Sequence, residues 1–266
     1  MRVSFVGLGY VGLTTAVCMA VKGFRVTGID VDIGKIDLIQ NGKPAFKEPG
    51  LEKLLSRVTS AKNFRCSTEY SDILGTDVTF ITVGTPSRQD GSIDLTQVVK
   101  ASKNIGEALA GSSKPHTVVV KSTVVPGTTK SHVRQALEQA SGRVVGEGLN
   151  LCVNPEFLRE GNAVKDTFKP DRIVIGDDWG GAGRVLLNLY RKFYGGKLAY
   201  ASSAEECLRG ADFCIVATEW DEFRKLKPRD FRKHMRNPVV IDGRRIYDPE
   251  AFSKSLRYAA VGLGNK

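Results

Sequence analysis

Short apolar runs alternate with longer amphipathic stretches through most of this chain. Such alternation is typical of βαβ units, in which helices connect parallel strands. The apolar runs predict strands at Val3–Gly7, Arg25–Ile29, Asp77–Val83, Thr117–Lys121, Leu149–Val153 and, at an edge, Arg172–Gly176. The amphipathic stretches predict helices at Val11–Lys22, Leu51–Val58, Leu95–Leu109 and Thr128–Ala140. We therefore expect an α/β fold with a Rossmann-type, doubly wound parallel sheet.

The pattern breaks at the glycine-rich segment Asp177–Gly183, which a predicted helix, Arg184–Phe193, follows. Beyond it an earlier piece of the chain recurs, because Gly75-Thr76-Asp77 and Gly210-Ala211-Asp212 each lie between a helix and an apolar run, 135 residues apart. Either a partial second Rossmann-like lobe or a generic helix-to-strand turn would produce this match. If the match marks a second lobe, the predicted domains are residues 1–178 and the partial lobe at 198–266. A connecting helix and linker at 179–197 join them.

In that lobe, Ser203 and Glu206 have the spacing of a capping box at the start of a helix. The next strand of the lobe is expected at Pro238–Asp242.

A glycine turn follows the first predicted strand. Gly7-Leu8-Gly9-Tyr10-Val11-Gly12 fits G-x-G-x-x-G, and its position between a strand and a helix makes the match specific. In this motif Gly7 permits the tight turn, Gly9 lets the backbone approach a pyrophosphate, and Gly12 lets the helix pack close to the strand. The phosphates would meet free N–H groups and the positive end of the helix dipole.

The second predicted strand ends at Asp30, 18 residues after Gly12. A carboxylate at this place accepts hydrogen bonds from the ribose hydroxyls and repels a 2′-phosphate. The sequence therefore predicts NAD as the cofactor in preference to NADP.

Four further motifs follow in order along the chain. They are Val83-Gly84-Thr85-Pro86, Lys121-Ser122-Thr123-Val124-Val125-Pro126-Gly127-Thr128, Asn154-Pro155-Glu156-Phe157-Leu158-Arg159-Glu160-Gly161 and Lys169-Pro170-Asp171-Arg172-Ile173-Val174-Ile175-Gly176. Together with Glu48-Pro49-Gly50-Leu51, they resemble the N-terminal domain of the UDP-glucose and related nucleotide-sugar dehydrogenases. The segments Ala217–Phe223 and Val240–Arg245 are similar to the end of the same family's C-terminal, UDP-binding domain.

The resemblance implies an activity and a set of site residues. The family oxidises a sugar's primary alcohol to a carboxylate in two hydride transfers to NAD. The cofactor-binding residues it implies are Gly7, Gly9, Tyr10, Val11, Gly12, Asp30, Lys35, Gly84, Thr85, Pro86, Thr123 and Glu160. The catalytic residues it implies are Thr123, beside the nicotinamide, and Glu156, which is similar to the family's acid/base or water-positioning glutamate.

The resemblance also places Glu156, Phe157, Leu158 and Arg244 at the nucleotide sugar, with Arg244 reaching it from the second domain. A carboxylate near a water accepts a proton when its pKa suits the pH, and a guanidinium pairs with a phosphate or two hydroxyls. The alternatives are structural: Glu156 caps neighbouring N–H groups at a strand end, and Arg244 is an exposed basic residue.

The family's helical middle domain has no counterpart in this sequence. That domain carries the nucleophilic cysteine in a Gly-Gly-x-Cys-Phe-Pro-Lys-Asp segment, a lysine and an asparagine on a long helix, and the main dimer contact. The first strand and helix of the C-terminal domain are missing as well. The second oxidation needs a tetrahedral adduct such as a thiohemiacetal, so we expect catalysis to be impaired. The oligomeric state is left open.

The composition limits the classes of partner that we expect the chain to bind. The chain has 266 residues and a formal net charge of +10, which favours acidic partners such as nucleic acid or a phosphorylated small molecule. Its basic residues are spread along the chain, with one concentration from Arg224 to Arg236, which argues against nucleic acid.

The remaining composition bears on the cell compartment. The sequence has no apolar stretch long enough for a membrane helix and no signal-peptide pattern. Its five cysteines, Cys18, Cys66, Cys152, Cys207 and Cys214, form no CxxC pair and read as small hydrophobic residues in a reducing compartment. We therefore expect a cytoplasmic protein.

Three hypotheses of function follow. The first is an NAD-dependent nucleotide-sugar 6-dehydrogenase that acts on UDP-glucose or a close relative, slowly or not at all. The second is a non-catalytic NAD-binding protein that regulates or pairs with a full-length relative. The third is a product of internal deletion that has no independent role.

Overall fold

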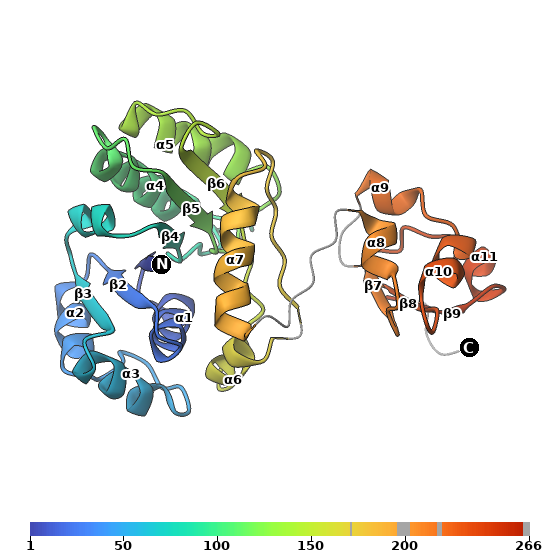
Figure 1. The fold of residues 1–266 in the computed structure, drawn as a ribbon, viewed down its shortest axis with the longest axis horizontal. Helices are drawn as coiled ribbons and strands as arrows, with labels where there is room; N and C mark the ends of the chain where they lie inside the picture. Colours follow the sequence, from blue (N-terminus) through green and yellow to red (C-terminus); the bar gives the residue numbers. More distant parts are fainter. Residues whose placement is uncertain (171, 196–202, 217–219, 263–266) are drawn as a thin grey trace. The chain divides into compact units, whose positions relative to one another are not determined.

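The structure is a computed structural model that describes residues 1–170, 172–195, 203–216 and 220–262 (Figure 1). The chain divides into two compact units, Met1–Lys197 and Leu198–Lys266. Each unit has its own sheet and its own buried core. Asp171 and the segment 217–219, which belong to motifs named above, lie outside the described residues.

The first unit is built on a six-stranded parallel sheet with strand order β3-β2-β1-β4-β5-β6. This order confirms the predicted Rossmann-type α/β fold, with the reversal of strand order between β1 and β4. Strands β4 and β5 are buried along their whole length, as expected of parallel strands covered on both faces. The strands are β1 (Arg2–Val6), β2 (Arg25–Ile29), β3 (Phe64–Ser67), β4 (Val78–Ile81), β5 (His116–Val120) and β6 (Leu149–Val153).

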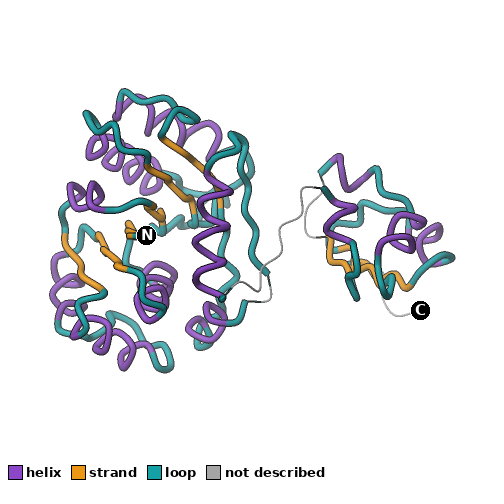
Figure 2. Tube along the Cα trace, viewed as in Figure 1, coloured by secondary structure: helices purple, strands orange, loops and turns teal. Residues whose placement is uncertain are grey.

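Helices cover both faces of this sheet (Figures 1 and 2). The first-unit helices are α1 (Tyr10–Val21), α2 (Ile33–Gln40), α3 (Leu51–Ser60), α4 (Thr96–Leu109), α5 (Arg134–Ser141), α6 (Ala163–Phe168) and α7 (Ala182–Tyr194). Helices α4 and α5 form one core with the apolar side chains of Val6, Ile81 and Val118. Helix α7 packs on β5 and β6, with Leu186, Leu189 and Phe193 buried. The segment between the predicted domains thus belongs to the first unit.

Two sequence predictions differ from the structure. The predicted edge strand Arg172–Gly176 is wrong: in the described residues there, only Gly176 forms an isolated antiparallel bridge, to Val153. The carbonyl of Val174 instead accepts the Asn154 side-chain amide at 2.7 Å, so a side chain takes the place of a partner strand. The predicted helix Thr128–Ala140 begins with a π-helical turn, η2 (Thr129–Val133), before α5.

The second unit contains a parallel sheet in the order β7-β8-β9, with β7 (Cys214–Val216), β8 (Val239–Asp242) and β9 (Arg257–Ala260). Its helices are α8 (Ala204–Leu208), α9 (Asp221–Arg224), α10 (Pro228–His234) and α11 (Pro249–Ser253). The rings of Phe231, Tyr247 and Phe252 pack together in its core. The Ser203 hydroxyl accepts the Glu206 amide and so caps α8, as the spacing predicts.

No helix among the described residues is long and apolar enough to cross a membrane.

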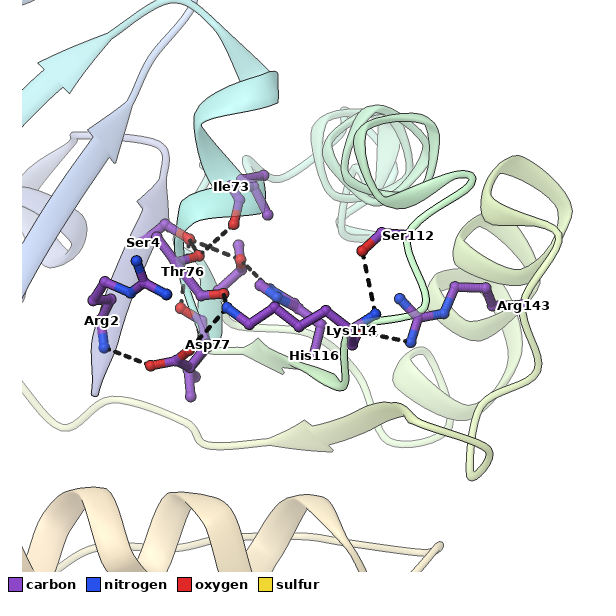
Figure 3. A network of polar contacts seen from close by, with 11 residues as sticks. Arg2, Ser4, Ile73, Thr76, Asp77, Ser112, Lys114, His116 and Arg143 are labelled. Carbon is purple, nitrogen blue, oxygen red and sulfur yellow. Dashed lines mark hydrogen bonds and ion pairs between the residues drawn. The ribbon is translucent and has the colours of Figure 1, made fainter.

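A buried polar network joins the amino ends of β1, β4 and β5 (Figure 3). The hydroxyl of Thr79 lies 2.7 Å from both the Ser4 hydroxyl and the His116 Nε2 atom. Ser4 and Thr79 are fully buried and His116 is 2% exposed, so the trio is closed to a substrate. Around it, Lys114 donates to the Asp77 carboxylate at 3.0 Å. These contacts lie at the sheet edge opposite the glycine turn and hold the strands in register.

Burial lowers the pKa of His116 to about 4, and the nearby positive charge of Lys114 acts in the same direction. The unfolded chain protonates this imidazole near its ordinary value of 6.5. Above pH 6.5 the imidazole is neutral in both states. Between pH 6.5 and 4 the unfolded state binds the additional proton, so stability falls as the pH falls.

We therefore expect the unfolding free energy of the first unit to drop by a few kcal/mol between pH 7 and pH 4.5, at about 1.4 kcal/mol per pKa unit. Urea unfolding across this range measures the effect. In His116→Gln, which keeps a hydrogen-bonding group beside Thr79, the slope should flatten. An equal slope in both proteins would mean that other groups govern it.

Candidate functional site

The carboxyl ends of the parallel strands meet at one edge of the first sheet, and the predicted site residues of the first unit follow them there. Side chains tie the loops to one another. The Thr82 hydroxyl, after β4, donates to the Gly7 carbonyl at 2.8 Å. The Ser122 hydroxyl, after β5, donates to the Val83 carbonyl at 2.7 Å. These contacts hold the loops around the switch point as one surface.

The three glycines of the turn have different surroundings. Gly7 has φ +94°, and a Cβ atom there would lie 2.8 Å from the Val83 amide nitrogen. A Cβ on Gly12 would lie 1.9 Å from the Gly7 carbonyl oxygen. A Cβ on Gly9 would meet no atom within 4 Å. Gly7 and Gly12 therefore allow close backbone packing, whereas Gly9 faces the open space that a pyrophosphate requires.

The acidic residue at the end of β2 is tied to this turn. The buried Asp30 carboxylate accepts the Leu8 amide at 2.7 Å, the Asp32 amide at 3.1 Å and the Lys35 ammonium at 2.8 Å. A carboxylate has about four acceptor positions, so one remains for a ribose hydroxyl. Tyr10 and Val11 begin α1. The N-cap residue of this helix is Gly9, which has no side chain to bond the first backbone N–H groups. Together these groups fit a dinucleotide.

The other predicted cofactor residues lie in the loops after β4 and β5. Gly84 and Pro86 are exposed and Thr85 is half-buried. The Pro86 carbonyl accepts the Asp94 amide at 2.8 Å, which closes the loop on itself. Thr123 is exposed after β5. These four residues are therefore accessible to a ligand at the carboxyl edge.

The loop after β6 carries the predicted substrate residues. Glu156 is half-buried, and its Oε2 atom accepts the Leu158 amide at 2.6 Å, so this carboxylate does cap a neighbouring N–H group. Its second oxygen remains for another partner. Phe157 is 41% exposed, and the Arg172 guanidinium lies 4.3 Å from its ring centroid. Glu160 is exposed.

A tyrosine–glutamate pair fastens this loop to the glycine turn. The Tyr10 hydroxyl donates to the Glu48 carboxylate at 2.6 Å and accepts the Gly161 amide at 3.0 Å. Glu48 also accepts the Gly161 amide, at 2.9 Å, and the Val164 amide, at 3.2 Å. Burial, reinforced by the hydrogen bond to Glu48, raises the pKa of Tyr10 to about 12, so the phenol stays protonated. The pair joins the predicted cofactor and substrate loops.

Arg244 belongs to the second unit. It follows β8, and its amide donates to the buried Asp242 carboxylate at 3.0 Å. The same carboxylate accepts the Tyr247 amide and the Tyr258 hydroxyl, which orders the loop that carries Arg244.

Residues 1–194 match the UDP-glucose/GDP-mannose dehydrogenase family, NAD binding domain. The chain belongs to this family. Residues 185–249 match the family's UDP binding domain, and the two matched regions overlap within α7. The first unit thus corresponds to the NAD-binding domain of this family.

Two relatives match more than two thirds of the chain. The GDP-mannose 6-dehydrogenase of Pseudomonas syringae pv. syringae is 43% identical over 193 residues, which cover 72% of this chain and 44% of that protein. The UDP-glucose 6-dehydrogenase AglM of Haloferax volcanii is 43% identical over 190 residues, with 71% and 44% covered. The chain spans less than half the length of these relatives.

Among solved structures, a ternary complex of GDP-mannose dehydrogenase from Pseudomonas aeruginosa is similar, with a TM-score of 0.71 and 42% identity. The match covers 72% of this chain and 44% of that chain.

Several residues at this edge were not among the sequence-predicted site residues. Glu48, Lys121 and Asn154 stand inside motifs quoted above, so their positions carried a signal. Tyr190 stands in α7 with only a helical apolar pattern around it. Its approach to Asn154 is a tertiary contact that no local pattern indicates.

The glycines offer a matched test of the turn. Gly12→Ala should destabilise the first unit by about 1–3 kcal/mol or more, because its Cβ would collide with the Gly7 carbonyl. Gly9→Ala should change stability by within about 1 kcal/mol and weaken NAD binding at least ten-fold, because its Cβ enters the open space. Thermal unfolding and calorimetric NAD titration measure these effects. Wild-type NAD affinity in Gly9→Ala would contradict the phosphate assignment.

Asp30→Asn preserves shape but removes the negative charge and replaces one acceptor oxygen with an NH2 donor. Hydrogen bonds to charged groups contribute about 1.5–3 kcal/mol, so we expect NAD affinity to fall about ten-fold or more. The preference for NAD over NADP should shrink, since the charge that repels a 2′-phosphate is gone. Asp37→Asn, on the exposed side of α2, is the control. An unchanged NAD/NADP ratio would contradict this role of Asp30.

Proposed function

We propose that this chain binds NAD and a nucleotide sugar, UDP-glucose or a close relative, and oxidises the primary alcohol of the sugar. The observation that carries the proposal is the glycine turn, held by Asp30 and joined through Tyr10 and Glu48 to the loop Pro155–Gly161. A cofactor on the turn and a sugar on the loop would therefore meet at one edge of the sheet. The names of the relatives support both UDP- and GDP-linked sugars as candidates.

The residues at this edge have complementary roles in the proposal. Bound NAD supplies the hydride acceptor. The Glu156 carboxylate accepts the hydroxyl proton, since its hydrogen bond from Leu158 holds one oxygen in place and leaves the other for the substrate. Thr123 would lie beside the nicotinamide, and Phe157 and Leu158 would offer backbone groups to the sugar nucleotide. Arg244 is the candidate ligand-binding residue of the second unit.

The thiols of the first unit are poor nucleophiles. Burial raises the pKa of Cys18 to about 12 and that of Cys66 to about 11. Burial likewise raises the pKa of Cys152, the cysteine closest in sequence to Asn154 and only 1% exposed. Because the thiolate is the attacking form, none of these three residues favours a thiohemiacetal with an aldehyde. We therefore propose that oxidation stops at the aldehyde.

The burial of these three thiols also favours a second candidate function. A chain that binds NAD without a reactive thiol in its first unit would serve as a non-catalytic partner or regulator of a full-length relative. The two candidates differ in whether hydride is transferred at all.

The amount of NADH formed per sugar nucleotide tests both. With UDP-glucose or GDP-mannose as limiting substrate, we expect one NADH per sugar and an aldehyde that a hydrazine reagent captures. Cys152→Ser should give the same amount, because the buried thiol takes no part. Two NADH per sugar would overturn the arrest at the aldehyde. No NADH, with NAD binding intact by calorimetry, would establish the non-catalytic candidate.

A further inference from the structure

A buried amine lies directly behind the proposed substrate loop. Lys121 follows β5 and is only 7% exposed. Its ammonium donates to the side-chain oxygen of Asn154, which follows β6, at 3.2 Å. The Tyr190 hydroxyl of α7 donates to the same oxygen. Both lone pairs of the Asn154 side-chain oxygen are therefore occupied. This oxygen cannot accept a second hydrogen bond from Lys121.

A cavity of about 50 Å³ adjoins this amine. Its polar lining includes Lys121, Asn154, Glu156, Asp166, Arg172 and Tyr190. An ammonium group has three N–H donors, and within the described part of the chain only Asn154 accepts one of them. The other two N–H groups are left for the cavity. A space of this size with several polar groups can hold ordered water.

Among the residues that the structure describes, Lys121 lacks the ion-pair partner that a buried structural lysine needs. Across the residues that the structure describes, no carboxylate lies within 4.0 Å of its ammonium. A buried charge without an ion pair is costly, and the amine responds by becoming a weaker base. Burial lowers the pKa of Lys121 to about 8, while the negative charge of Glu156 acts in the opposite direction.

The other titratable groups around the cavity are held in one charge state near neutral pH. The bidentate contact with Arg159 lowers the pKa of Asp166, which stays ionised. Burial raises the pKa of the Tyr190 and Tyr194 phenols, which stay protonated. Among the described residues that line the cavity, Lys121 and Glu156 are placed to pass a proton between them.

We infer that Lys121 and Glu156 form one proton-sharing pair, connected by water in this cavity, through which the proton leaving the substrate hydroxyl passes. This inference rests on the proposed function. As the alcohol carbon loses hydride to bound NAD, the O–H bond breaks and Glu156 takes the proton. Water relays it to Lys121 in its neutral amine form, which becomes ammonium, and the carboxylate is restored. Lys121 is thus a positioning residue that acts through Glu156.

The coupling can be measured without turnover. The full chain with ¹³C- and ¹⁵N-labelled lysine is titrated by NMR, and the Lys121 signal is assigned by its loss in Lys121→Met. We expect this signal to titrate well below those of the exposed lysines. In Glu156→Gln its midpoint should fall by about half a pH unit or more, because the carboxylate that stabilises the ammonium is gone.

Two variants serve as controls. Glu147→Gln removes an exposed carboxylate elsewhere in the first unit and should leave the Lys121 midpoint unchanged. Glu156→Asp keeps the charge and should restore most of the wild-type midpoint. A merely structural lysine would also respond to the Glu156 charge, so the pH profile of NADH formation is the readout that distinguishes a proton relay. In the active protein, Lys121→Met should also shift the pH profile of NADH formation, while NAD affinity stays within two-fold.

The outcomes separate the inference from the proposed function. The same Lys121 midpoint in wild type and Glu156→Gln would overturn the pair, whatever NADH assays show. A midpoint equal to that of the exposed lysines would also overturn it. A shifted midpoint in a chain that binds NAD but forms no NADH would support the pair and overturn the proposed oxidation.

Discussion

The Asp30 carboxylate accepts the Leu8 amide at 2.7 Å and so fastens the end of β2 to the glycine turn between β1 and α1. Its contact with Lys35 places a cation beside it without removing the last acceptor position. Because Gly7 and Gly12 bring backbone atoms closer than any Cβ allows, this turn has one geometry. Next to these close contacts, Gly9 borders open space, because a Cβ there would meet no atom within 4 Å. The NAD-binding assignment depends on this combination.

The two edges of the first sheet have different roles. Residues at one edge stabilise the fold, and residues at the other are accessible to a ligand. At the amino edge, Ser4, Thr79 and His116 are buried and satisfy one another, which excludes substrates and holds three strands together. At the carboxyl edge, exposed Thr123 and half-buried Glu156 leave acceptors and donors for a ligand. The same types of polar side chain therefore have opposite roles, and burial distinguishes them. His116, at the amino edge, is therefore structural even though it contacts the Thr79 hydroxyl.

Helix α7 links the family assignment to the local chemistry. It packs on β5 and β6, and its Tyr190 completes the polar group around Asn154. The two family matches overlap in this helix, so it contributes to the core of the NAD-binding domain at the point where the second match begins. The Tyr190 hydroxyl occupies the second lone pair of the Asn154 side-chain oxygen, so that oxygen accepts only one N–H group of Lys121. A helix that reads as a connection in the sequence thereby shapes the cavity behind Glu156.

The sequence by itself determined the strands that become β1, β2, β4, β5 and β6, because runs buried on both faces carry a strong apolar signal. It also determined the glycine turn and its acidic partner, since their function depends on local backbone geometry. It could not distinguish the single bridge at Gly176 from a strand, because the decisive hydrogen bond comes from Asn154. Only the tertiary structure decided which polar residues are buried together. Packing between distant segments produced the Tyr10–Glu48 contact, the depressed pKa of His116 and the cavity at Lys121.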